Sequence, residues 1–258
     1  MEKRYCQYPF LTDKNNLYNI GYGHKNFRAF INVNKEKGVS MKSILYNETF
    51  TRISEEKRNK ILQTATNEFA EHGFESANIN TIAKKSGISI GAMYSYFNSK
   101  ENLFITIIQY AVETLKSVLD EIMLSDHDLL FKLEKIIQAI QLNSRENVQL
   151  TKLYGQLTAE NRSDLISQIV SDMESVSADI YTKFLEQAQN EKIIRDDINV
   201  NLFAFFLDNL FITLQFSYSC EYYKKRMKIF VGEDIFENDD LVAEQLLEFI
   251  KSTFLFNV

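Results

Sequence analysis

The sequence predicts an all-α fold, with a small N-terminal helix-turn-helix head followed by a larger helical body. Breakers are scarce, because the 258 residues include only one proline and 8 glycines, too few for a turn-rich β architecture. Apolar residues make up 45% of the chain and recur at helical spacing over long stretches. Residues 78–97 also read as two short helices joined by a tight turn, the helix-turn-helix pattern.

Length and composition fit a soluble intracellular protein. A chain of 258 residues can form one or two domains with a substantial core. The two cysteines, Cys6 and Cys220, lack the spacing of a metal motif or a disulfide framework, which suits a reducing compartment. Neither a secretory leader nor an uninterrupted apolar run of membrane-spanning length is recognisable. We therefore expect a cytoplasmic protein with no membrane partner.

Residues 1–52 form an N-terminal extension that mixes aromatic residues with Asn and Lys and shows no sustained period. Residues 36–40 can be encoded by a purine-rich string that resembles a bacterial ribosome-binding sequence, and Met41 follows directly. One hypothesis is that translation starts at Met41 and that residues 1–40 are a misassigned leader, which an intact-mass measurement would test. The alternative is a basic arm that touches DNA, since residues 1–40 carry 7 basic and 3 acidic side chains.

The overall net charge of −6 is unevenly distributed along the chain. Residues 41–105 carry 8 basic and 7 acidic side chains, whereas residues 106–258 carry 14 and 25. The acidity therefore lies beyond the helix-turn-helix, where it would not meet phosphate. This distribution permits DNA binding and predicts modest non-specific affinity.

The head is predicted to contain three helices, with a fourth leading into the body. Ser54 fits the N-cap of the first, which Gly73 ends. Asn78 fits the N-cap of the second, and Gly87 suits the left-handed turn that follows it. Two further N-caps are expected, Ser89 for the third helix and Ser99 for the fourth.

The segment EFAEHGFESANINTIAKKSGISIGAMYSYFNSKENLF resembles the TetR family of transcriptional regulators. The resemblance spans about fifty residues and defines a DNA-binding domain at 53–103. Its matching features are Gly73-Phe74, Ile82-Ala83, Gly87-Ile88-Ser89, Tyr94, Phe97, Ser99-Lys100-Glu101 and Leu103.

The resemblance implies that the third helix reads DNA in the major groove. Ile90 and Ala92 offer methyl groups to thymine, and Asn80 can pair with adenine. Gly91 either lets the backbone approach DNA closely or is a neutral substitution that the helix tolerates. The full set of DNA-contacting positions implied by the resemblance is Asn78, Asn80, Thr81, Ser89, Ile90, Gly91, Ala92, Tyr94, Tyr96 and Lys100, the last three toward phosphate.

Residues 104–258 are expected to form a helical domain for effector binding and dimerisation. A stripe from Phe104 to Ile122 continues the fourth helix and, by resemblance, links head to body. Asp126-His127-Asp128 then breaks it; three adjacent residues rarely converge on one ion, so a helix cap is favoured and no metal is assigned. Further helices follow around residues 129–140, 147–157 and 165–190.

Two strongly apolar C-terminal helices, over 202–219 and from Asp240 onward, suit a four-helix dimer interface. The second interpretation is burial within one subunit. The family commonly binds a small molecule in the body and then loses DNA affinity through a pendulum-like shift of the heads. Four aromatic residues are the candidates for lining that pocket: Tyr110, Tyr154, Phe206 and Phe211.

Together these observations predict a homodimeric repressor of a palindromic double-stranded operator, released by an unidentified small apolar or amphipathic effector. Enzymatic activity is disfavoured, because HExxH, GxSxG, CxxC and P-loop motifs are all missing from the sequence. No catalytic residue, cofactor or metal is assigned. A DNA-binding activator or an architectural protein without an inducer is the alternative.

Overall fold

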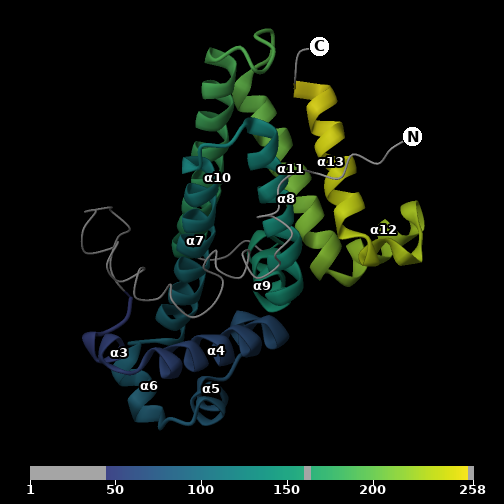
Figure 1. Cartoon of the computed structure of the whole chain (residues 1–258). Coiled ribbons are helices and arrows are strands. Elements are labelled where there is room, and N and C mark those ends of the chain that lie inside the picture. Colours follow the sequence, from purple (N-terminus) through teal and green to yellow (C-terminus); the bar gives the residue numbers. More distant parts are fainter. Residues whose placement is uncertain (1–44, 160–163, 255–258) are drawn as a thin grey trace.

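The computed structural model describes residues 45–159 and 164–254, which fold into helices without any strand (Figure 1). The all-α prediction is confirmed. The hypotheses about residues 1–40 and Met41 fall outside the described residues. In chain order the helices are α3 (Glu48–Arg52), α4 (Glu55–Ser76), α5 (Ile79–Ser86), α6 (Ile90–Tyr96), α7 (Lys100–Leu124), α8 (Leu129–Glu146), α9 (Val148–Ala159), α10 (Asp164–Asn190), α11 (Val200–Ser219), α12 (Glu221–Val231), the 3₁₀ turn η1 (Glu233–Glu237) and α13 (Asp239–Phe254).

Side-chain caps set the starts of the head helices, as the sequence predicts. The Ser54 side chain accepts a hydrogen bond from the Lys57 N–H, and Ser99 accepts one from Asn102. Each cap satisfies an N–H that has no partner within its own helix. Asp128 caps α8 by accepting from the Phe131 N–H, which confirms the expected cap in the Asp126–Asp128 segment.

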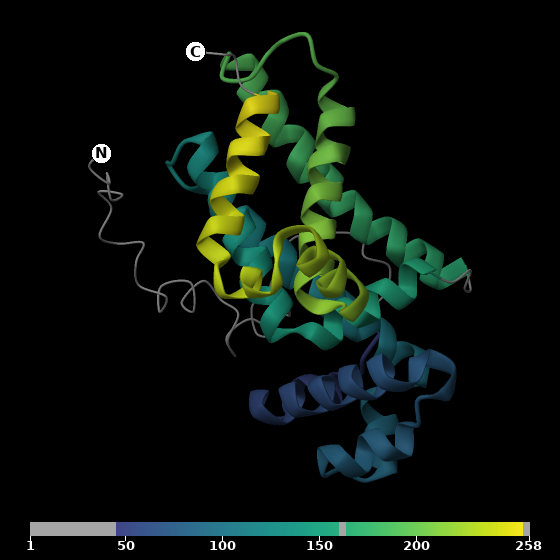
Figure 2. The ribbon, with the colours of Figure 1, turned by 90° about the vertical axis from the view of Figure 1, so that its right-hand side faces the viewer.

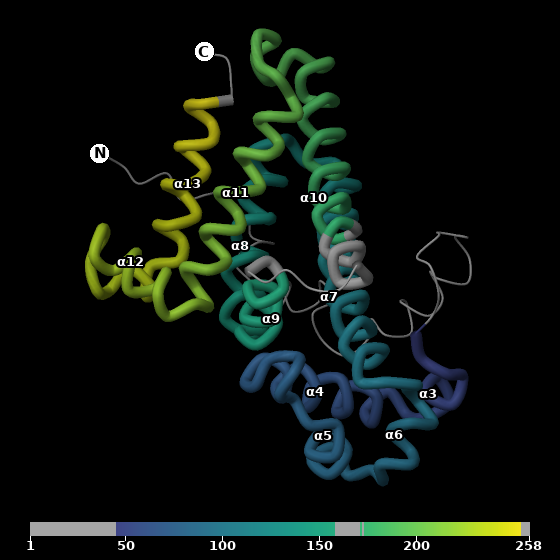
Figure 3. Tube along the Cα trace, turned by 180° about the vertical axis from the view of Figure 1, so that it is seen from behind, coloured from purple at the N-terminus to yellow at the C-terminus, as the bar shows by residue number. Residues whose placement is uncertain are grey.

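The head lies at one end of the molecule, and α7 rises from it into the body alongside α10 (Figures 1 and 2). Within the body, α11 packs against α8 and α10, while α13 packs against α8. The same arrangement is visible from behind, where α7 runs continuously from the head into the body (Figure 3). One long helix thus connects the head to the body.

A second connection joins head and body through α9, which packs against α4. Leu153 and Leu157 of α9 are buried in the same apolar cluster as the head core. The Gln156 Nε2 donates to the Ala70 carbonyl at 3.2 Å, across the boundary. The head is therefore held to the body at two places.

The structure differs from the sequence expectation at two helices. Helix α3 begins before residue 53, and Phe50 within it is fully buried against the head, so the folded head includes part of the predicted extension. Helix α12 was not predicted and has no buried residue.

Helix α11 buries one face in the body and leaves the other face open. Leu202, Phe205 and Phe206 are all more than half exposed, whereas Leu207 and Phe211 are buried. By length and composition alone, α11 could span a membrane, with a mean hydropathy of 1.3. It also contains Asp208, and it packs against four other helices of the body, α8, α9, α10 and α12.

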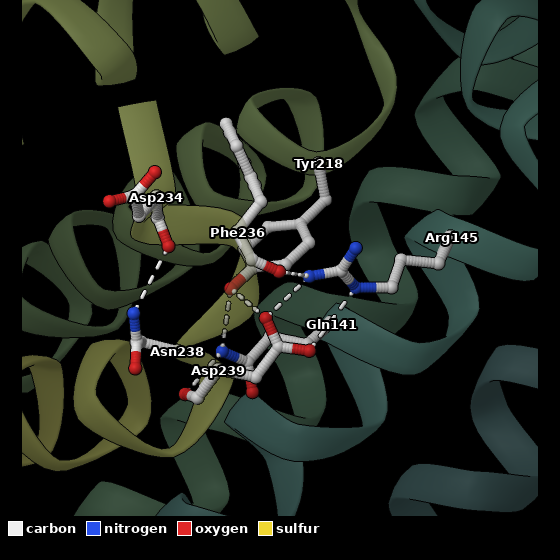
Figure 4. A network of polar contacts seen from close by, with 7 residues as sticks. All are labelled: Gln141, Arg145, Tyr218, Asp234, Phe236, Asn238 and Asp239. Atoms are coloured by element: carbon white, nitrogen blue, oxygen red, sulfur yellow. Dashed lines mark hydrogen bonds and ion pairs between the residues drawn. The ribbon is translucent and has the colours of Figure 1, made fainter. Parts of the chain in front are cut away.

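A polar network fixes the start of α13 to α8 and α11 (Figure 4). The Arg145 guanidinium binds the Asp239 carboxylate through two nitrogens and also donates to the Phe236 carbonyl. The Tyr218 hydroxyl donates to the same carboxylate at 2.8 Å, and Gln141 donates to that hydroxyl at 2.9 Å. Because these polar groups are hydrogen-bonded to one another, the network fixes the position of the start of α13 relative to α8 and α11.

Candidate nucleic-acid interface

Helices α5 and α6 and the turn between them form the helix-turn-helix unit. The Asn78 side chain caps α5 by accepting from the Asn80 N–H at 2.9 Å. Gly87 ends α5 in the left-handed conformation, with φ of 74°, which glycine adopts without a Cβ penalty. The Ser89 hydroxyl then caps α6 by accepting from the Ala92 N–H at 3.1 Å. The sequence-predicted pattern is confirmed residue by residue.

Helix α6 presents one face to solvent and buries the other. Ile90 is 39% and Tyr94 48% exposed, and Gly91 lies between them on the open side. Met93 and Phe97 are fully buried, as expected for core positions. The exposed face carries no charge, so base readout there would rest on apolar contacts and the Tyr94 hydroxyl.

Gly91 is not required by the packing of the chain itself. A Cβ built at this position would meet only the Ser89 hydroxyl oxygen, at an ordinary contact distance of 3.9 Å. Glycine inside a helix costs about 1 kcal/mol relative to alanine. The fold would therefore tolerate alanine, so packing within the subunit does not explain the glycine. Close approach of DNA at Gly91 stays a prediction, with tolerated substitution as the alternative.

The other expected contact positions divide into exposed and internal groups. Asn80 is exposed and Thr81 half-buried at the start of α5, and Ala92 is half-buried in α6. Asn78 and Ser89 are exposed, but their side-chain oxygens already act as caps. These two side chains can still donate hydrogen bonds to DNA, through the amide NH₂ of Asn78 and the hydroxyl proton of Ser89.

Tyr96 and Lys100 are engaged within the head. Tyr96 is buried, with its ring centroid 5.7 Å from that of Phe50. The Lys100 ammonium donates to the carbonyls of Glu75 at 2.9 Å and Ala77 at 3.2 Å. It also lies over the Phe74 ring, so it fastens the end of α4 to the start of α7. Contact of either residue with phosphate stays a prediction.

Glu68 is a supporting residue that the sequence analysis missed. Its carboxylate is almost fully buried on α4 and accepts from the Asn78 N–H at 3.3 Å and from the Lys85 ammonium at 3.1 Å. These contacts fix both ends of α5 against α4. The signal in the sequence is an acidic residue between Ala65 and Phe69, inside an otherwise apolar stripe.

Residues 61–107 match the family model described as bacterial regulatory proteins, tetR family. Over these residues the chain is similar to TetR-family regulators. It is 27% identical over 167 residues to the uncharacterized HTH-type transcriptional regulator YhgD of Bacillus subtilis, a match that covers 64% of this chain and 86% of YhgD. It is 36% identical over 64 residues to the HTH-type transcriptional repressor AcnR of Corynebacterium glutamicum, covering 25% of this chain and 34% of AcnR.

Solved structures of transcriptional regulators share the fold. The transcriptional regulator FadR of Bacillus subtilis, in complex with stearoyl-CoA, aligns with a TM-score of 0.59 over 73% of this chain and 97% of FadR, at 19% identity. At that identity the alignment speaks for the fold alone. The predicted resemblance to TetR-family DNA-binding regulators is confirmed for the head, and the predicted fold is confirmed.

The four aromatic residues expected to line an effector pocket lie in different surroundings. Tyr110 packs against the cluster that includes the head core. Phe211 is buried in the body core, where its ring meets Tyr181 edge-on at 5.6 Å, while Phe206 is half-exposed on the outer face of α11. The structure therefore does not bring them together around one described site.

Tyr154 has the most polar surroundings of the four. Its hydroxyl donates to the Glu174 carboxylate at 2.9 Å, and burial together with the nearby Glu174 and Asp208 charges raises its pKa. Burial, and secondly the charge of Glu174, raises the pKa of Asp208 to about 6. Neither acid was singled out from the sequence, although Asp208 stands there in an otherwise apolar stretch.

Proposed function

We propose that this TetR-family protein is a homodimeric repressor that binds a palindromic operator and is released by a small apolar or amphipathic ligand. The observation that carries DNA reading is the uncharged face of α6, where Ile90, Gly91 and Tyr94 lie exposed at the end of a capped helix-turn-helix. AcnR, a relative, is named a repressor. Such a regulator would act in the cytoplasm without catalysing a reaction.

The open faces of the two C-terminal helices support a homodimer. Leu202, Phe205 and Phe206 on α11 and Leu241 and Phe249 on α13 are exposed apolar side chains. Exposed large apolar side chains gathered on the open face of a helix are typical of a protein–protein interface. A two-fold dimer would place two heads on two half-sites, so the operator would be an inverted repeat.

The two links between head and body support release by a ligand. A ligand that binds more tightly to the form whose head spacing does not fit the operator would lower the affinity for DNA. The size of that loss is set by the ratio of the ligand's affinities for the two forms. A displacement of α9 would be transmitted to α4 through Leu153, Leu157 and the Gln156–Ala70 hydrogen bond. Helix α7 would transmit movement of the rest of the body to the head. The FadR structure with stearoyl-CoA supports an amphipathic ligand as the first class to screen.

In-vitro selection from a library of random DNA duplexes tests this function. We expect enrichment of an inverted repeat with half-sites about one helical turn or a multiple of it apart. Enrichment of no sequence would contradict specific regulation and favour the architectural alternative. Placing the selected site upstream of, or within, a reporter promoter then separates repression from activation.

A further inference from the structure

The segment before α4 lies against the C-terminal end of the reading helix. The Asn47 backbone N–H donates to the Tyr96 carbonyl at 2.8 Å, and its side-chain amide donates to the Ser95 carbonyl at 3.1 Å. The Thr49 hydroxyl also donates to the Ser95 carbonyl. Carbonyls in the last turn of a helix have no partner within it. Residues 45–53, called here the α3 segment, supply those partners for α6.

The same segment fills the apolar space behind α6. Phe50 is fully buried, with its ring centroid 4.6 Å from Phe97 and 5.7 Å from Tyr96. The Tyr46 ring also packs against Phe50, with 5.7 Å between the two ring centroids. The backbone at the end of α6 is therefore held by hydrogen bonds on its edge and by aromatic packing underneath.

The α3 segment is itself anchored to α4. The Arg58 Nη1 donates to the carbonyls of Thr51 at 2.9 Å and Ile53 at 2.6 Å. Its positive charge lies at the C-terminal end of α3, where the helix dipole favours a cation. The segment thus bridges α4 and α6, and it precedes the family match, which begins at residue 61.

We propose that the α3 segment is a clamp that sets the orientation of α6, so that Asn47 and Thr49 are positioning residues for DNA reading that do not contact DNA themselves. This inference rests on the proposed function. Helix α6 has seven residues, too few to be stable alone, so its orientation depends on the elements that hold it. Base contacts need an oriented helix, whereas phosphate attraction is sequence-independent.

Two substitutions at the exposed Thr49 test the clamp in the full chain. Thr49→Val keeps the shape but removes the donor, and Thr49→Ser keeps the donor. In the DNA-free protein, Thr49→Val should speed amide hydrogen exchange across residues 93–97 and leave α5 unchanged. It should also weaken binding to the selected operator about tenfold, with affinity for random DNA retained. Thr49→Ser should behave as wild type in both, and Asn47→Ala should reproduce the loss.

Arg52→Ala is the matched control, because Arg52 is exposed on the same helix and pairs only with Glu48 there among the described contacts. We expect it to change neither measurement. If it weakens binding to both DNAs and lowers the salt dependence, α3 contacts phosphate and the clamp is rejected. Unchanged exchange in Thr49→Val, or faster exchange without a change in operator preference, also overturns it. Should wild type select no sequence, the proposed function fails, while the exchange pattern still decides whether α3 holds α6.

Discussion

The buried Glu68 carboxylate of α4 lies 3.1 Å from the Lys85 ammonium in the last turn of α5. Glu68 is almost fully buried, whereas the Lys85 side chain is about half-exposed. The same carboxylate accepts from the Asn78 N–H at the start of α5. One acid therefore determines how the first helix of the helix-turn-helix sits on the head.

Replacing Glu68 by alanine should destabilise the head. The Asn78 N–H and the Lys85 ammonium would lose their acceptor, a loss that typically costs about 1–3 kcal/mol. Chemical denaturation followed by circular dichroism measures the change. Glu71→Ala is the control, since Glu71 is exposed on the same helix; an equal loss there would show that the burial of Glu68 is irrelevant.

Gly91→Ala should separate folding from DNA binding. Alanine meets no obstacle within the chain, and helix propensity predicts a gain in stability of up to about 1 kcal/mol. Operator affinity should nevertheless fall, because the added methyl group would occupy space at the DNA backbone. Thermal unfolding and fluorescence anisotropy measure the two effects, and a variant with higher stability and full affinity would favour tolerated drift at Gly91.

Tyr218→Phe should loosen α13. The substitution removes the hydroxyl that donates to Asp239 and accepts from Gln141, a loss of about 1–2 kcal/mol for two hydrogen bonds. We expect a lower unfolding midpoint in urea. Tyr222→Phe, at an exposed position of α12, serves as the comparison and should have no effect.

Asp208→Asn should stabilise the protein more at pH 8 than at pH 5. The pKa of Asp208 is raised from 3.8 to about 6 by burial and the Glu174 charge, so the fold favours the neutral form. That favourable contribution is complete below pH 3.8 and is lost as the pH rises through about 6. Asparagine mimics the neutral form at every pH. Thermal unfolding of both proteins at the two pH values decides; equal gains at both would refute the assignment.

Phe205→Glu should break the proposed dimer, because a charge would be placed on the open apolar face of α11. Light scattering should then give the mass of one chain, 30.1 kDa, and operator binding should weaken by more than tenfold. Ile229→Glu on α12 changes an apolar residue that is more exposed than Phe205 and lies outside the proposed interface. If both variants, or neither, become monomeric, the interface is misplaced.

The head was largely predictable because its signals are local. Each cap, from Ser54 to Ser99, depends on a side chain only two or three residues from its partner, and Gly87 marks its own turn. The exposed positions Ile90 and Tyr94 follow directly from the helical register.

The α3 segment and Glu68 escaped prediction because their partners are distant in sequence. Phe50 looks like one more aromatic residue in an irregular stretch until the fold brings Phe97 beside it. Phe206 and Phe211 differ by five positions on an apolar helix, and only the neighbours of α11 expose one and bury the other. Composition could not distinguish a pocket from a core or from a dimer surface.

The most direct measurement is fluorescence anisotropy of the full chain with the selected operator and with random duplex DNA over a salt series. The account predicts operator affinity at least a thousandfold above that for random DNA at physiological salt, consistent with the roughly 10³–10⁷ preference of specific DNA-binding proteins. As the salt concentration rises, the affinity for random DNA should fall by a larger factor than the affinity for the operator. Equal, strongly salt-dependent affinity for both duplexes would contradict sequence-specific reading by α6.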